Sequence, residues 1–349
     1  MYLDHFQLQE HPFRLTPDFD FFYMSRGHAR AKAYLDYTVV SRDGFAVITG
    51  EIGAGKTTLL NKLISELGTN TVLAHISQTQ LDEFEFLQAV VSAFGLEIAG
   101  ASKVELMNRL RAFLLRQLES DRRVVLAVDE AQNLSYGVLE EVRMLSGIES
   151  DKTKLISVIL MGQPELERVI NAPQLEQLSQ RVRLRFHLTP LTDEETQDYI
   201  RHRLQVARSP RLDLFEEEAY DVIRYYAGGI PRLINTLCDM ALLTAYVEDQ
   251  STVSAQDVKL AAKELAWPSF AEREARMKEA GTAPGSAASS MGHADDSPSG
   301  NGADDEVQVF SQTIEQAVEN VRVGFEGLRS DLQAIERRLA EVVRRLDER

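Results

Sequence analysis

The residues with the clearest chemical potential form one short stretch, Gly50-Glu51-Ile52-Gly53-Ala54-Gly55-Lys56-Thr57, followed directly by Thr58. This stretch satisfies the pattern G-x-x-x-x-G-K-[ST] at every fixed position. Its glycines allow the backbone to curl so that several N–H groups point at one anion. The Lys56 ammonium can reach the β- and γ-phosphates of a nucleotide, and the Thr57 hydroxyl can hold Mg²⁺. We therefore expect residues 50–58 to bind a nucleoside triphosphate.

Hydrolysis needs further groups, and two acidic residues at the end of an apolar run supply the first of them. Residues 124–128 are Val-Val-Leu-Ala-Val, and Asp129 and Glu130 follow them. Asp129 would hold Mg²⁺ through water, and Glu130 would orient and polarise the attacking water. An apolar strand that ends in acids is common by itself, but it gains specificity behind a complete phosphate loop.

Two polar residues further along the chain extend the candidate site, and each has a plain structural alternative. Gln163 follows the apolar run 155–161 and would hydrogen-bond the γ-phosphate or the water, unless it only begins a turn before Pro164. Arg232 begins a helix and would close over the phosphates, unless it is an ordinary solvated or packing arginine.

A cation for the charge that develops on the phosphates is expected just before the last strand of the sheet. Arg181 would reach the nucleotide of a neighbouring subunit as an arginine finger. Arg183 and Arg185 lie close to it in sequence. One of the three arginines is expected to be the finger, and the other two would be ordinary surface charges.

The elements that must position these groups alternate between strands and helices over residues 1–190. The apolar and periodic runs predict strands at 46–49, 72–76, 124–128, 155–161 and 183–188, and helices after the loop and at 84–94 and 104–118. This alternation predicts an α/β domain with a doubly wound parallel sheet, the fold class of a P-loop NTPase.

The pattern becomes all-helical over residues 191–266, which predicts a small helical lid domain. Expected helices run from a capping box at Thr192 to about Ala207, over 216–227, from Pro231 to about 247, and over 254–265. Within the predicted domain 1–190, residues 1–40, which precede its first strand, are rich in aromatics. These either pack onto the core or partly stack on the adenine ring at the mouth of the loop.

Two different segments are expected after the lid: a flexible linker at 267–305 and a coiled coil at 306–349. Residues 281–305 are rich in Gly, Ala, Ser, Pro and Asp, a composition typical of linkers. Ten apolar residues then alternate at spacings of four and three, namely Ile314, Val318, Val321, Phe325, Leu328, Leu332, Ile335, Leu339, Val342 and Leu346. This heptad stripe predicts assembly with copies of the chain or with another protein, because a lone helix packing on the body would drift off a 3.5-residue period.

Composition and charge narrow the classes of partner. The formal net charge is −16 and each predicted domain is acidic, which argues against binding nucleic acid through bulk charge. The single cysteine, Cys238, lies in an apolar helical run and is expected to be a buried core thiol. We find no signal-peptide pattern and no apolar run long enough to span a membrane, so we expect a cytoplasmic protein.

Four motifs taken together resemble the AAA+ ATPases of the ExeA/GspA type. They are residues 50–57, Asp129-Glu130-Ala131-Gln132-Asn133, Gly162-Gln163-Pro164-Glu165-Leu166 and Gly228-Gly229-Ile230-Pro231-Arg232, and residues 11–18 are similar to that family's N-terminal signature. The resemblance, which covers about residues 1–265, implies an ATPase that uses ATP and Mg²⁺ and completes its active site between subunits of an oligomer. It also implies Walker, sensor and finger roles for Lys56, Thr57, Asp129, Glu130, Gln163, Arg181 and Arg232.

The predicted C-terminal coiled coil departs from this resemblance. Secretion-associated members carry a membrane span and a peptidoglycan-binding module after the ATPase, which puts a direct role on the cell wall in doubt. We expect instead a cytoplasmic ATPase that serves an envelope export, secretion or exopolysaccharide system through a protein partner, and that reaches the inner membrane only through that partner.

Two other functions stay open. The same ATPase type resembles transposition regulators of the TniB/TnsC kind, which assemble on DNA when ATP is bound, although the acidic charge counts against this alternative. A scaffold that binds ATP as a switch and barely hydrolyses it is a third, and the Asp129-Glu130 pair counts against it.

Overall fold

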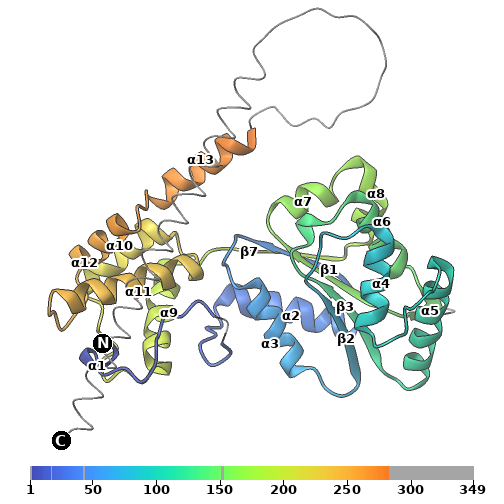
Figure 1. Cartoon of the computed structure of the whole chain (residues 1–349), viewed down its shortest axis with the longest axis horizontal. Helices are drawn as coiled ribbons and strands as arrows, with labels where there is room; N and C mark the ends of the chain where they lie inside the picture. The colour runs from blue at the N-terminus through green and yellow to red at the C-terminus, as the bar shows by residue number, and fades with distance from the viewer. Residues whose placement is uncertain (1, 17, 42–43, 151–152, 283–349) are drawn as a thin grey trace, which may run out of the picture. The chain divides into compact units, whose positions relative to one another are not determined.

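A computed structural model describes residues 2–16, 18–41, 44–150 and 153–282 of the chain. These residues form a parallel sheet covered by helices and, after it in sequence, a bundle of helices (Figure 1). The predicted coiled coil at 306–349 and residues 283–305 of the predicted linker lie outside this part of the chain, so both stay predictions.

The main sheet has five parallel strands in the order β2-β3-β6-β1-β7. They are β1 (Phe45–Gly50), β2 (Thr71–Ile76), β3 (Arg123–Val128), β6 (Ser157–Gly162) and β7 (Leu184–Leu188). The short strands β4 (Glu149–Ser150) and β5 (Thr153–Lys154) form a separate antiparallel pair. Because the five strands are parallel, the residues that follow β1, β3 and β6 meet at one edge of the sheet.

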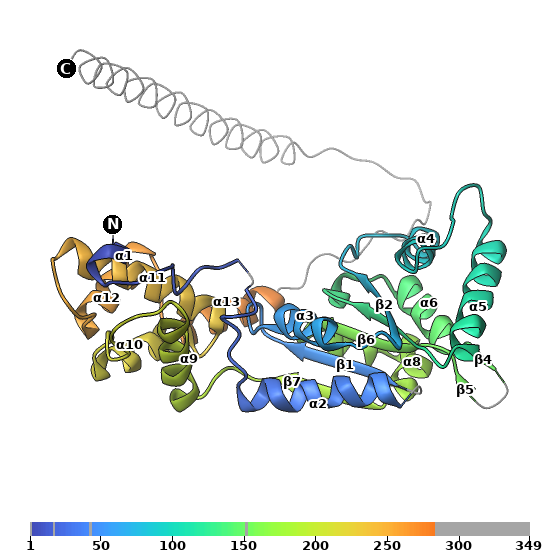
Figure 2. The same cartoon turned by 90° about the horizontal axis from the view of Figure 1, so that it is seen from below.

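Side chains of the central strands alternate between two hydrophobic clusters, one on each face of the sheet. Val124, Leu126 and Val128 of β3 join the first cluster, and Val125 and Ala127 join the second. Helices α2 (Arg26–Val40) and α3 (Lys56–Glu66) cover the second face, and α2 packs along β7 (Figure 2). The first face is covered by helices α4 (Glu83–Ala93), α5 (Lys103–Glu119), α6 (Tyr136–Ser146), α7 (Glu165–Ile170) and α8 (Glu176–Arg181), with the 3₁₀ turns η1 (Ala131–Asn133) and η2 (Pro173–Leu175). Helices on both faces of a parallel sheet confirm the predicted doubly wound fold class.

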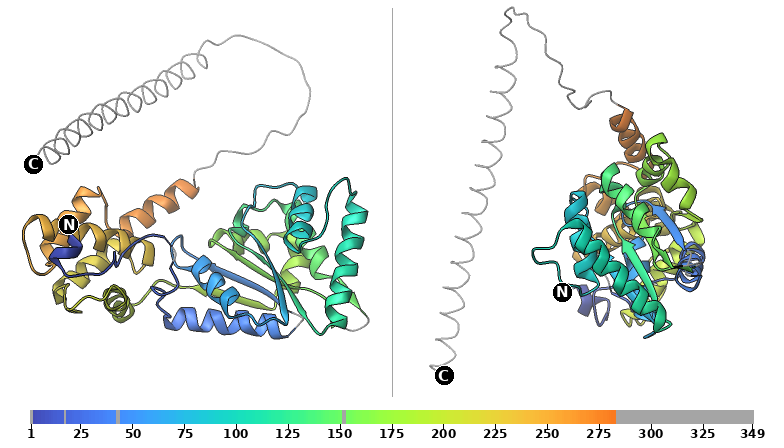
Figure 3. Two further views of the ribbon diagram at one scale, coloured as in Figure 1. Left: turned by 60° about the horizontal axis from the view of Figure 1, so that its bottom comes forward. Right: turned by 90° about the vertical axis from the view of Figure 1, so that its right-hand side faces the viewer.

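The predicted lid domain is an all-helical bundle, seen as the yellow and orange helices in Figure 3. Its helices are α9 (Asp193–Val206), α10 (Glu217–Ala227), α11 (Pro231–Val247) and α12 (Ala255–Glu264). The capping box at Thr192 is present, and Gly228 ends α10 in a left-handed conformation with φ +59°. Cys238 is fully buried in this core, where burial raises the pKa of its thiol.

Two sequence predictions need correction. Helix α13 (Phe270–Thr282) occupies part of the predicted linker 267–305, because residues 270–276 are good helix formers and the linker composition begins only after them. The strand expected at 155–161 begins at Ser157, since the Leu155 N–H donates to the Ile148 carbonyl (3.0 Å) instead of joining the sheet. In addition, no helix was predicted for the residues that form α2, α6, α7 and α8. In the described part of the chain, no helix is long and apolar enough to cross a membrane.

The aromatic N-terminal residues pack mainly onto the lid. Helix α1 (Tyr2–His5), Phe6, Phe13 and Phe21 are part of the lid's hydrophobic cluster. The Tyr2 hydroxyl donates to Asp239 of α11 at 2.5 Å. We call residues 2–16 and 18–25 the N-terminal segment; it runs over the lid before entering α2.

Candidate active site

The phosphate-binding loop runs from the end of β1 at Gly50 to the start of α3 at Lys56. Gly53 and Gly55 have left-handed backbone angles, with φ +83° and +96°, a conformation that other residues rarely adopt. A Cβ on Gly53 would lie 2.5 Å from the Cβ of Arg232, and one on Gly55 would lie 2.8 Å from Nε2 of His28. The two glycines therefore let the loop curl and let α11 and α2 approach it closely.

Lys56 reaches back across this loop. Its Nζ donates to the carbonyl oxygens of Gly50 (2.7 Å) and Glu51 (3.0 Å), and only 5% of the residue is exposed. Burial lowers the pKa of Lys56, while the nearby carboxylates of Glu130 and Asp129 oppose this shift. The structure thus holds a buried ammonium at the loop, where a bound phosphate would stabilise its charge.

Thr57 and Asp129 meet although they are far apart in sequence. The Thr57 hydroxyl donates to Oδ2 of Asp129 at 2.6 Å, and Asp129 is 3% exposed at the end of β3. A hydroxyl and a carboxylate oxygen at this separation are the ligand types that Mg²⁺ takes from proteins when nucleotide phosphates and water complete its octahedron. The donor set therefore fits the predicted Mg²⁺ site, while the described residues include no cluster of three or more His, Cys, Asp or Glu side chains that could hold a metal ion by themselves.

Glu130 lies next to this pair with an unusual backbone. Its φ is +51°, and its N–H donates to Oδ1 of Asp129 at 2.9 Å. The amide of Gln132 donates to the Glu130 carboxylate at 2.6 Å, and the side chain of Gln163 approaches the same oxygen at 3.5 Å. The structure thus brings Glu130 and Gln163 together from the ends of β3 and β6.

His28 of α2 contacts the phosphate loop through a hydrogen bond, a contact that was not predicted from the sequence. Its Nε2 donates to the Ala54 carbonyl at 3.0 Å, and its Nδ1 accepts from the hydroxyl of Ser25, the N-cap of α2, at 2.7 Å, in the tautomer that satisfies both bonds. The ring is 4% exposed, and burial lowers the pKa of His28. A lone histidine near a helix start gave no sequence signal for this contact.

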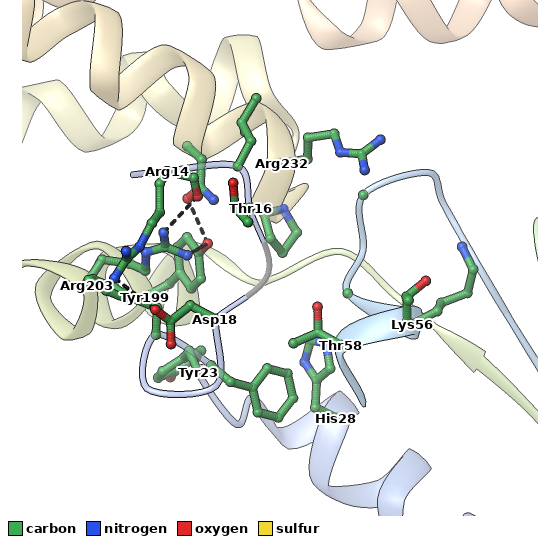
Figure 4. Close-up of a pocket in the computed structure, with 18 of the residues that line it drawn as sticks. Arg14, Thr16, Asp18, Tyr23, His28, Lys56, Thr58, Tyr199, Arg203 and Arg232 are labelled. Carbon is green, nitrogen blue, oxygen red and sulfur yellow. Dashed lines mark hydrogen bonds and ion pairs between the residues drawn. The ribbon is translucent and has the colours of Figure 1, made fainter. Parts of the chain in front are cut away.

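A cavity of about 250 Å³ extends from the loop toward the lid. Its walls contain Lys56, Thr57 and Glu130 on the sheet side. Figure 4 shows Lys56 and Thr58 on one side of the cavity and Arg14, Tyr199 and Arg203 on the other. The N-terminal segment and helices α9 and α11 therefore form the wall opposite the phosphate loop.

Arg203 of α9 organises this opposite wall. The residue is 6% exposed and donates to the carbonyl oxygens of Pro12 (2.5 Å) and Arg14 (3.1 Å) and to the Tyr199 hydroxyl (3.2 Å). Its guanidinium lies 4.6 Å from the ring centre of Phe21, and that of Arg14 lies equally close at 4.6 Å. This guanidinium–aromatic arrangement attaches the N-terminal segment to the lid.

Arg232 lies at the start of α11, where its backbone N–H donates to the Gly53 carbonyl at 3.3 Å. Its side chain is exposed and lines the cavity, and its charge lowers the pKa of Lys56 after the larger effect of burial. Two cations facing one cavity favour an anionic ligand.

The three candidate finger arginines, two of them before β7 and Arg185 within it, are not among the residues that line this cavity. Arg181 donates to the Arg143 carbonyl and the Ser146 hydroxyl, both at 3.2 Å, at the end of α6. Arg185 donates to Oδ1 of Asn171 at 2.7 Å, and the Arg183 N–H donates to the Phe45 carbonyl at 3.0 Å. Since Phe45 begins β1 and the loop follows its end, Arg183 lies at the end of the strands opposite the chain's own phosphate loop, and Arg185 pairs with Val47 inside the sheet.

Most predicted site residues therefore gather at one place. Those that line the cavity are Ile52, Gly53, Gly55, Lys56, Thr57, Thr58, Glu130 and Arg232. Asp129 and Gln163 contact that group through Thr57 and Glu130, whereas Arg181 does not join it. No site role was predicted for His28, Arg203 or Gln132. Only Gln132 lies in a sequence motif that could have indicated a role, the one that begins with Asp129.

Comparisons with known proteins agree with this architecture. Residues 39–170 match the family described as AAA domain. The chain is 40% identical over 266 residues to General secretion pathway protein A of Aeromonas hydrophila, an alignment that spans 76% of this chain and 48% of that relative. The chain thus spans about half the length of the curated relative that it matches.

Solved structures with the same fold include two archaeal proteins. CDC6P of Pyrobaculum aerophilum superimposes with a TM-score of 0.53 at 18% identity, covering 72% of this chain and 70% of that one. The ORC2 protein of Aeropyrum pernix, in ADPNP-ADP complexes, gives a TM-score of 0.52 at 19% identity. The superposition covers 73% of this chain and 72% of the ORC2 chain. At these identities the likeness establishes the fold alone.

Proposed function

Since this chain is an AAA-domain protein related to General secretion pathway protein A, we propose that it binds ATP with Mg²⁺ and hydrolyses it. The observation that supports this function best is the 2.6 Å contact between the Thr57 hydroxyl and the Asp129 carboxylate. This contact joins the phosphate loop to the end of β3, and Lys56 and Glu130 line the same cavity.

Different residues of the chain bind the nucleotide and promote its hydrolysis. The loop N–H groups and the Lys56 ammonium hold the β- and γ-phosphates. Thr57 and Asp129 would hold Mg²⁺, which would neutralise charge on the phosphate oxygens. Glu130 accepts a hydrogen bond from the attacking water and orients it in line with the γ-phosphate. Gln163 donates its side-chain amide to the γ-phosphate or to that water.

The lid side of the cavity holds the rest of the nucleotide. Tyr199, Arg203 and Asn235 line the cavity with Phe21 and Tyr23 of the N-terminal segment. The Tyr199 hydroxyl donates to Oδ1 of Asn235 at 2.7 Å, which fixes this wall. Arg232 lines the cavity from the start of α11, which already contacts the loop, so its guanidinium would bind the phosphates.

An oligomer would complete the site. Arg183, two residues after Arg181, donates its N–H to the Phe45 carbonyl at the start of β1, and six residues at about 3.3 Å each put that end of the strand roughly 20 Å from the loop. Arg181 therefore serves as a finger only for the nucleotide of a neighbouring subunit, with Arg183 and Arg185 as alternatives. The predicted coiled coil at 306–349 would reinforce such an assembly or recruit a partner.

The proposed partner is a protein of a secretion or related envelope system. The support is the 40% identity to General secretion pathway protein A, together with the acidic charge of −16. The alternative, an ATP-dependent DNA-binding regulator of the transposition type, is opposed by the same charge.

The test is ATP hydrolysis by the purified full chain with Mg²⁺, for wild type and Glu130→Gln. We expect the substitution to lower kcat by about 10²- to 10⁴-fold while ATP still binds, because only the base is lost. Wild-type turnover in this variant would remove Glu130 from the mechanism. The same assay with and without duplex DNA, at fixed moderate salt, separates the two functions: indifference to DNA supports a protein-directed ATPase, and strong stimulation supports the alternative.

A further inference from the structure

Gln132 forms hydrogen bonds to two other polar residues of the site, Glu130 and Gln163. Its Nε2 donates to Oε2 of Glu130 at 2.6 Å, and its Oε1 accepts from the backbone N–H of Gln163 at 3.0 Å. One side chain thus connects the acid after β3 to the polar residue after β6. The hydrogen bond from Gln163 Nε2 to the same Glu130 oxygen is at the outer limit, at 3.5 Å.

The chemistry of these two contacts fixes which way the Gln132 amide points. A carboxylate only accepts hydrogen bonds and a backbone N–H only donates, so the NH₂ group must face Glu130 and the oxygen must face Gln163. Turning the amide over would place oxygen against oxygen and N–H against N–H. Gln132 is therefore held in one orientation by both partners.

The surrounding backbone is arranged to admit this side chain. A Cβ on Gly162 would lie 2.8 Å from Oε1 of Gln132 and 3.2 Å from its backbone nitrogen, so a side chain at position 162 would displace it. Glu130 has a φ of +51°, which is uncommon for a residue other than glycine and occurs often at functional sites. The 3₁₀ turn η1 (Ala131–Asn133) follows Glu130 directly and contains Gln132.

We propose that Gln132 is a positioning residue that orients the Glu130 carboxylate and couples it to Gln163; this role rests on the proposed ATP hydrolysis. By occupying Oε2, Gln132 leaves Oε1 of Glu130 to accept a hydrogen bond from water. Because its other end is bound to the backbone of Gln163, a shift of that residue on contact with the γ-phosphate moves Gln132 and with it Glu130. The water-orienting carboxylate then responds to the presence of the γ-phosphate.

The experiment measures kcat, KM and ATP affinity of the full chain for Gln132→Ala, Gln132→Glu and a matched control, Asn133→Ala. Asn133 lies in the same turn and is exposed. Gln132→Glu keeps the size of the side chain and an acceptor for Gln163 but replaces the donor that faces Glu130. We expect both Gln132 variants to lose about 10- to 100-fold in kcat, less than loss of the base itself, and Gln132→Ala to keep its ATP affinity within about two-fold of wild type. The control keeps wild-type kcat.

A second measurement separates positioning from a structural role. In the Glu130→Gln background, adding Gln132→Ala should change the residual rate by less than two-fold, because the group that it orients is already lost. The proposal is wrong if both Gln132 variants turn over ATP at wild-type kcat, or if their losses multiply with that of Glu130→Gln. If wild type itself does not hydrolyse ATP, the proposed function fails and the positioning role falls with it.

Discussion

At the phosphate end of the cavity, the polar side chains follow the ends of β1, β3 and β6 in one sheet, whereas the lid end is assembled from the N-terminal segment and helices α9 and α11. The phosphate end contains short hydrogen bonds to charged groups, such as that from Thr57 to Asp129 at 2.6 Å. The lid end instead has Arg203 bonded to main-chain carbonyls and lying against Phe21.

The two ends of the cavity are therefore expected to differ in role. The phosphate end determines the ATP chemistry, and the lid end determines the conformation of the lid. Groups at strand ends of a packed sheet keep their geometry whether or not the lid moves. The lid end depends on contacts between segments that are about 190 residues apart, and it changes whenever the N-terminal segment or α9 shifts. We therefore expect substitutions at the phosphate end to act on ATP chemistry and those at the lid end to act on stability and on the lid.

The strongest test of the phosphate end is Lys56→Ala. We expect ATP affinity to fall by about 100-fold or more, because the variant loses charge-assisted hydrogen bonds to the phosphates in a desolvated site. The fold should persist, since the lost contacts within the protein are two hydrogen bonds to loop carbonyls. Calorimetric titration with ATP and circular dichroism measure the two effects.

Lys62→Ala is the matched control for this change. Lys62 lies on the same helix, and its ammonium pairs with Glu66 at 3.2 Å on the partly exposed side of α3. Its ATP affinity should equal that of wild type. An unchanged affinity in Lys56→Ala would contradict the assignment of the loop.

The strongest test of the lid end is Arg203→Ala. The change leaves two carbonyl oxygens and a hydroxyl in a buried region without their donor, and we expect it to lower the free energy of unfolding by about 3 kcal/mol. The N-terminal segment should also become accessible to protease. Denaturant titration and limited proteolysis measure these effects.

Arg201→Ala provides the comparison on the same helix. Arg201 lies over the Tyr220 ring at 5.6 Å and makes a long ion pair with Glu217 at 3.9 Å near the surface, so its loss should cost less than about 1 kcal/mol. If Arg203→Ala instead abolished kcat and left stability unchanged, the division between chemistry and conformation would be wrong.

The two ends also differ in how far sequence alone predicts them. The phosphate loop is a contiguous pattern, and Asp129 and Gln163 follow apolar strands whose parallel arrangement brings their ends together. The placement of Gly50–Thr58, Asp129 and Glu130 at one edge follows from those rules. Their catalytic roles remain predictions.

The lid end carries no comparable sequence pattern. Arg203 lies on an amphipathic helix, where an arginine is normally assigned to the solvent side, and its partners Pro12 and Arg14 are about 190 residues away in sequence. His28 contacts the loop through a single carbonyl, at Ala54. Such contacts depend on how the segments pack together, which one sequence does not specify.

The smallest expected effect is on the pH dependence of stability, through one histidine at each end of the cavity. His28 contacts the phosphate loop, and His202 lies against Tyr23 of the N-terminal segment. Burial lowers the pKa of both in the folded state, so below about pH 6.5 the unfolded chain binds more protons than the folded one. The contribution of these two histidines to stability is therefore greatest above pH 6.5 and falls as the pH decreases toward their folded-state pKa values. Each pKa unit of lowering corresponds to about 1.4 kcal/mol of this loss.

We expect His28→Gln to flatten the fall in unfolding free energy between pH 7.5 and 5.5 more than His202→Gln does, because His28 is the more deeply buried ring. Denaturant titrations across this range measure both slopes against wild type. Protonation of His28 would also deprive the Ser25 hydroxyl of its acceptor on Nδ1, which ties acid sensitivity to the loop support rather than to the lid. A steeper contribution from His202 would show that the lid end, and not the phosphate end, is the acid-sensitive part of the site.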